Sequence, residues 1–69
     1  MSGYKIEIAS VPDRERLVAE IWYAEKLVAE INQEKGNLEI EFYEFGKISF
    51  GLEEFIKILE TAKKELREK

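Results

Sequence analysis

Glutamates two residues apart are the residues of this sequence whose type and spacing could do chemistry. Glu39 and Glu41 point the same way on an extended strand, about 6.8 Å apart, and Glu7, Glu20 and Glu30 join them if four strands share a sheet. Paired carboxylates serve acid–base catalysis when an apolar pocket raises one pKa, and they bind Mg²⁺ or Ca²⁺ from acidic loops. An open sheet face supplies no such pocket, and no EF-hand loop is present. We therefore expect neither catalysis nor a metal site.

Other kinds of site find little support in the 69 residues. The sequence has no cysteine or histidine, which removes the commonest zinc ligands and the usual nucleophile–base pairs. Only Ser2, in the N-terminal segment left outside the fold, has a lysine at Ser-x-x-Lys spacing, and the four glycines form no phosphate-binding motif. No stretch approaches the roughly 20 apolar residues of a membrane span. We expect a protein that is not an enzyme and that needs no cofactor.

The net charge of −4 is placed unevenly along the chain. Residues 1–51 hold ten acidic and six basic side chains, whereas residues 52–69 hold five of each. An acidic surface disfavours nucleic acids and anionic membranes as direct partners and favours a basic protein surface. No signal peptide is visible at the N-terminus, so a cytoplasmic protein is expected.

Apolar residues at every second position predict four strands, at residues 4–10, 16–23, 27–33 and 38–44. One face of each strand is apolar and the other carries the glutamates. The predicted apolar face consists of Tyr4, Ile6, Ile8, Leu17, Ala19, Ile21, Tyr23, Leu27, Ala29, Ile31, Leu38, Ile40 and Phe42. Residues 1–3 are left outside the fold.

One long helix over residues 13–35 is the main rival interpretation, because leucine, alanine, glutamate and lysine favour helices and Asp13 could cap one. The apolar residues of this segment, however, scatter around the whole helical circumference. The pentapeptide Leu-Val-Ala-Glu-Ile occurs at 17–21 and again at 27–31. Its ten-residue offset preserves the side of a strand but rotates a helix by about 80°. The pattern favours a hairpin that turns at residues 24–26, although this turn lacks glycine and asparagine.

Residues 52–67 predict a helix with Gly51 at its cap, and Phe50 and Phe55 at the positions of a hydrophobic staple. Its predicted buried face consists of Leu52, Phe55, Ile56, Leu59, Ala62 and Leu66. The sequence therefore predicts a single α+β domain over residues 1–69. It is a four-stranded antiparallel sheet, a meander, with one C-terminal helix packed on its apolar face.

Trp22, Tyr43 and Phe45 share the acidic face with the glutamates, as do Val18 and Val28. Aromatic residues among polar ones are typical of protein-binding patches. Two alternatives are that they pack across strands, or that the N-terminal segment or a second copy covers part of this face. If the face binds a partner, the residues expected to touch it are Glu7, Glu20, Trp22, Glu30, Glu39, Glu41 and Tyr43.

The run YKIEIASVPDRERLVAEIWY at 4–23, with EINQE at 30–34 and LEIEFY at 38–43, resembles a family of short, acidic, largely uncharacterised bacterial and mobile-element proteins. In size and acidity the chain is also similar to anti-CRISPR inhibitors, some of which act as DNA mimics. The resemblance implies an inhibitor that occupies a basic surface of a nucleic-acid-handling complex. The alternative is a small self-associating module, a homodimer that pairs through its aromatic residues or an open sheet edge.

Overall fold

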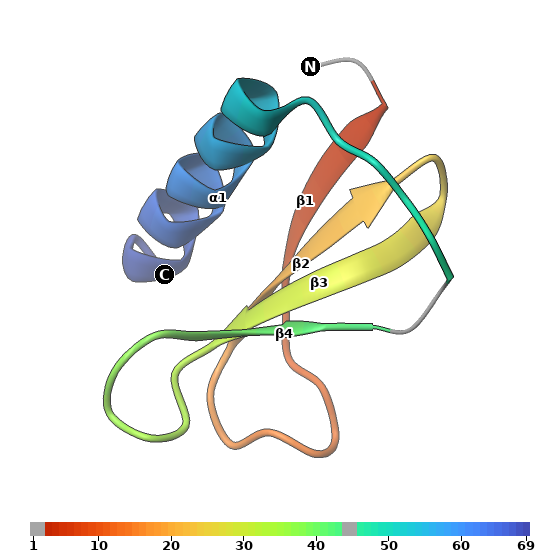
Figure 1. Cartoon of the computed structure of the whole chain (residues 1–69). Coiled ribbons are helices and arrows are strands. Elements are labelled where there is room, and N and C mark those ends of the chain that lie inside the picture. Colours follow the sequence, from red (N-terminus) through yellow and green to blue (C-terminus); the bar gives the residue numbers. More distant parts are fainter. Residues whose placement is uncertain (1–2, 44–45) are drawn as a thin grey trace.

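A computed structural model describes residues 3–43 and 46–69 and shows the predicted α+β architecture (Figure 1). The sheet contains four strands in sequence order, each antiparallel to the next, and a single helix follows them. The elements are β1 (Tyr4–Ala9), β2 (Val18–Tyr23), β3 (Lys26–Asn32), β4 (Glu39–Phe42) and α1 (Leu52–Arg67). The rival helix over 13–35 is wrong, since this segment contains the whole of β2 and β3.

The turn between β2 and β3 consists of Ala24 and Glu25, and both have left-handed backbone conformations with φ of 51° and 67°. A two-residue hairpin needs positive φ at both positions, which Asn-Gly usually supplies. Holding residues with a Cβ there costs about 1 kcal/mol each, so the packing of the two strands must offset that cost. The tight turn begins β3 at Lys26, one residue before the predicted start.

A β-bulge follows this turn and shifts the register between Ile21 and Trp22. Beyond it, Trp22 pairs with Leu27 rather than with Val28. Residues directly opposite one another share a side of the sheet. The prediction that Leu27 belongs to the apolar face is therefore wrong, because strict alternation cannot reveal an inserted residue.

The helix begins where the sequence predicts, with Gly51 as N-cap. The predicted staple is confirmed, since the Phe50 and Phe55 rings stack with centroids 4.7 Å apart. The predicted buried face is wrong in part: Ile58 is fully buried with Ala62 and Leu66, whereas Leu52 and Ile56 are exposed.

Helix α1 packs chiefly against β1 and β2, beside the red and orange strands of Figure 1. Aromatic contacts fix this position, because the Phe50 ring lies 5.2 Å from that of Tyr23 and the Phe55 ring 6.2 Å from that of Tyr4. The helix therefore covers one half of the apolar face. On the other half, Ile40 of β4 is 39% exposed and Phe42 is 60% exposed.

Candidate functional site

Four glutamates lie side by side in one row across the sheet. The strand register sets Glu7 opposite Glu20, Glu20 opposite Glu30 and Glu30 opposite Glu41. Neighbouring strands are about 4.8 Å apart, and like charges directly opposite one another destabilise a sheet. We call these four residues the glutamate row. Such a row requires compensating contacts elsewhere in the chain.

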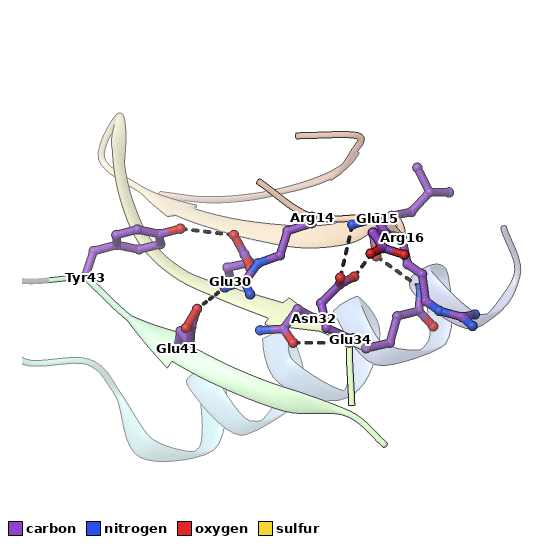
Figure 2. A network of polar contacts seen from close by, with 10 residues as sticks. Arg14, Glu15, Arg16, Glu30, Asn32, Glu34, Glu41 and Tyr43 are labelled. Atoms are coloured by element: carbon purple, nitrogen blue, oxygen red, sulfur yellow. Dashed lines mark hydrogen bonds and ion pairs between the residues drawn. The ribbon is translucent and has the colours of Figure 1, made fainter. Parts of the chain in front are cut away.

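Arg14 supplies the main compensation, from the loop between β1 and β2 (Figure 2). Its Nε donates a hydrogen bond to Oε2 of Glu30 at 2.9 Å, and its Nη2 pairs with Oε1 of Glu41. The other oxygen of Glu30 accepts a hydrogen bond from the Tyr43 hydroxyl at 3.0 Å. Glu30 is only 4% exposed, and a carboxylate in such a place is stable only when paired and hydrogen-bonded.

Burial raises the pKa of the Tyr43 hydroxyl, and its hydrogen bond to the Glu30 carboxylate raises this pKa further. Tyr43 therefore keeps its proton and remains a donor at neutral pH. Arg14, Glu30, Glu41 and Tyr43 together form what we call the closed half of the outer face.

In the described part of the chain, the segment that crosses this face is the β1–β2 loop, through Arg14. Val18, which the alternation assigns to the outer face, is completely buried. Val28, assigned to the same face, lies beside the bulge and is instead part of the hydrophobic core that contains Ile58. The sequence interpretation missed Arg14. A signal was present, because Arg14 lies in a short connection between two strands that carry unmatched glutamates. Only the folded path of the loop, however, shows that its guanidinium reaches Glu30 of β3 and Glu41 of β4.

Glu34 anchors the other end of the same loop. Its two carboxylate oxygens accept hydrogen bonds from the backbone N–H groups of Glu15 and Arg16, each at 3.0 Å. The Glu15 N–H lowers the pKa of the Glu34 carboxyl, and with help from Arg16 it outweighs the opposing effect of burial. We call this arrangement the Glu34 clamp; it holds Arg14 over the sheet.

The open half of the outer face lies over β1 and β2. Glu7, whose side chain is 51% exposed, pairs loosely with Lys5 at 3.7 Å. The Lys5 ammonium also lies 5.5 Å from the centre of the Trp22 ring, close enough for a cation–π contact. The Trp22 indole donates to Oε1 of Glu20 at 3.3 Å. The structure thus brings Glu7, Glu20 and Trp22 together.

The remaining predicted contact residues lie on or beside β4. Glu39 is half-buried opposite Asn32 and lies 3.8 Å from Lys35. The side chain of Glu41 keeps 51% exposure despite its contact with Arg14. Phe45, also assigned to this face, falls outside the described residues. Glu39 is separate from the glutamate row.

With four carboxylates against Lys5 and Arg14, the glutamate row keeps a net charge of −2. In residues 3–43 and 46–69, no three acidic side chains are grouped so that they could hold a metal ion. The same ranges contain no helix with the length and apolar character to cross a membrane. The outer face is thus a polar surface of net negative charge that includes two aromatic residues, Trp22 and Tyr43.

Compared with protein-family models, curated proteins and solved structures, the chain shows no significant match. The resemblance to short acidic bacterial and mobile-element proteins therefore stays a prediction.

Removing Arg14 should destabilise the fold by leaving the buried Glu30 carboxylate without its cation. We expect Arg14→Met to lower Tm by roughly ten degrees. Adding Glu30→Met should recover most of this loss, because two apolar side chains then replace the pair. Thermal unfolding followed by circular dichroism measures both. If Arg14→Met is as stable as the wild type, or the second substitution adds to the loss, the pair is not the element that closes this face.

The Glu34 clamp should make stability depend on pH in the acid range. The folded pKa of Glu34 lies below its ordinary value of 4.5, so the carboxylate stabilises the fold above that pH. This contribution is lost as the pH falls through the lower, folded pKa. We expect Glu34→Gln to lower Tm at neutral pH and the two Tm curves to converge below pH 4.5. Glu15→Gln, which removes a carboxylate from the same loop without touching the clamp, is the control. Curves that stay parallel would show that the clamp does not form.

Proposed function

We propose that the protein is a non-enzymatic binding protein whose acidic outer face docks on a basic surface of another protein. The observation that carries the proposal is the glutamate row, which keeps a net negative charge and is open at its β1–β2 end. An inhibitor that occupies the basic groove of a nucleic-acid-handling complex would need a surface of this kind.

The two halves of the face contribute differently to such docking. Glu30 is buried and bonded to Arg14 and Tyr43, so its carboxylate holds these two side chains in place and is not accessible to a partner. Glu7 and Glu20 remain available to a cation, and Trp22 beside them offers the aromatic contact typical of binding hot spots. We therefore assign direct contact to Glu7, Glu20 and Trp22, with Glu39 and Glu41 at the far edge.

Phosphate mimicry is the narrower form of this proposal. Carboxylates at strand spacing can present negative charge in an ordered line, as a nucleic-acid backbone does. Each half of the row has one cation against two carboxylates, but Arg14 is bonded closely to Glu30 and Glu41, whereas the exposed Lys5 only pairs loosely with Glu7 at 3.7 Å. The carboxylates of Glu7 and Glu20 are therefore the ones left accessible for mimicry. The proposal thus predicts which end of the row matters most.

The test is capture of a partner from an extract of the cells that make the protein, identified by mass spectrometry at low and high salt. Raising the ionic strength from about 0.1 M to about 1 M shortens the screening length from about 10 Å to about 3 Å, so binding should weaken strongly. For the captured protein, Glu7→Gln with Glu20→Gln should raise the Kd roughly fivefold to tenfold.

The matched control is Glu53→Gln with Glu68→Gln, which removes the same charge from exposed positions at the two ends of α1. It should leave the Kd close to that of the wild type. Binding that ignores salt, or that responds equally to both double variants, contradicts docking through the outer face.

A further inference from the structure

A groove with apolar walls runs between α1 and β4, on the half of the sheet that the helix leaves uncovered. It has a volume of about 220 Å³, and its apolar lining comes from Ile31, Leu38, Ile40 and Leu59. Exposed apolar side chains continue it, because Phe42 follows Ile40 on the same side of the strand and Ile56 precedes Leu59 by one helical turn.

The backbone of β4 has hydrogen-bonding groups directed outward at the same place. Tyr43 donates its N–H to the Val28 carbonyl at 3.1 Å, which continues the register between β3 and β4. Because bonding residues alternate along an antiparallel pair, Glu39 and Glu41 bond to β3, whereas Ile40 and Phe42 direct their N–H and C=O groups away from it. In the described part of the chain, β4 is an edge strand with no neighbour on that side.

We infer that this edge receives an extended segment of a partner protein in which apolar residues alternate with lysine or arginine. The inference rests on the proposed function, since it specifies the partner's chemistry. A strand added to an open edge gains main-chain hydrogen bonds, and its alternate side chains select the site. On the helix side these side chains enter the apolar groove; on the other side they lie beside Glu39 and Glu41, where a cation is favourable.

The charge order of the outer face supports a basic segment. Towards the β4 edge, the charges of the outer face alternate in sign, from Glu30 to Arg14 to Glu41. A lysine or arginine opposite Glu41 extends this order by one further cation. Glu41 is 51% exposed, so its carboxylate is accessible to a second donor.

A second copy of the chain fits this edge less well. Two antiparallel registers bring Ile40 opposite an apolar residue of another β4, either Ile40 or Phe42. The first sets Glu39 opposite Glu41, and the second sets Glu41 opposite Glu41. Like charges directly opposite one another destabilise such pairs, which favours a basic partner over self-pairing.

The test is an NMR titration of the full, ¹⁵N-labelled chain with a synthetic peptide of roughly seven residues, acetylated and amidated, in which lysine alternates with valine. The amide signals of Ile40 and Phe42 should shift and become protected from exchange. Ile40→Pro should bind about tenfold more weakly than Ile40→Ala, because both shorten the side chain but only proline removes the outward N–H. Proline is tolerated there because this N–H does not bond to β3.

Two control peptides define specificity: glutamate alternating with valine, and the lysines and valines of the first peptide in separate blocks. Both should bind about tenfold more weakly than the first. Equal binding of all three peptides, or shifts confined to the β1 edge, overturns the inference. Concentration-dependent shifts at Ile40 and Phe42 without peptide also overturn it and assign the edge to a second copy.

The outcome is separable from that of the proposed function. If the peptide fails at β4 while partner capture remains sensitive to salt and to Glu7 and Glu20, only the strand-addition inference falls. If the peptide binds at β4 but captured partners ignore the outer face, docking through the glutamate row falls instead.

Discussion

The burial of the Glu30 carboxylate is the constraint on which the outer face depends. Glu30 is 4% exposed, so its negative charge must be compensated by an ion pair and hydrogen bonds. Arg14 provides the ion pair from the β1–β2 loop, and Tyr43 provides a hydrogen bond from the end of β4. The β1–β2 loop is thereby drawn across the sheet, and Val18 at the start of β2 is fully buried. The glutamate row becomes compatible with a stable sheet because a cation stands between two of its members.

This closure divides the molecule into surfaces of different character. On one half of the outer face, Arg14 and Tyr43 bond to the buried Glu30, and the other half presents Glu7, Glu20 and Trp22. On the opposite side, α1 covers β1 and β2 and leaves the groove beside β4 open. The two proposals assign different means of contact to these accessible surfaces, charge at the outer face and main-chain pairing at the edge.

Period-two alternation predicted the four strands, and capping and staple residues predicted the start of the helix. The sequence could not reveal features that depend on register or three-dimensional placement. The bulge moved Leu27 out of the apolar face, and the aromatic contacts of Phe50 and Phe55 fixed a helix orientation that buries Ile58 instead of Ile56. The acidic face was evident from spacing alone. The single row and its Arg14 partner were not, because they require the pairing of strands and the path of a loop.

The most direct test of the central claim is the NMR behaviour of the Arg14 side chain. If Arg14 is held against the buried Glu30, its Nε–H should give a distinct resonance that exchanges slowly with solvent and shows a nuclear Overhauser contact to the Tyr43 ring. Arg67, exposed at the end of α1, is the internal reference and should exchange fast. Slow exchange of Arg14 relative to Arg67 is the predicted result. Equal, fast exchange of the two would show that the loop does not close on the sheet.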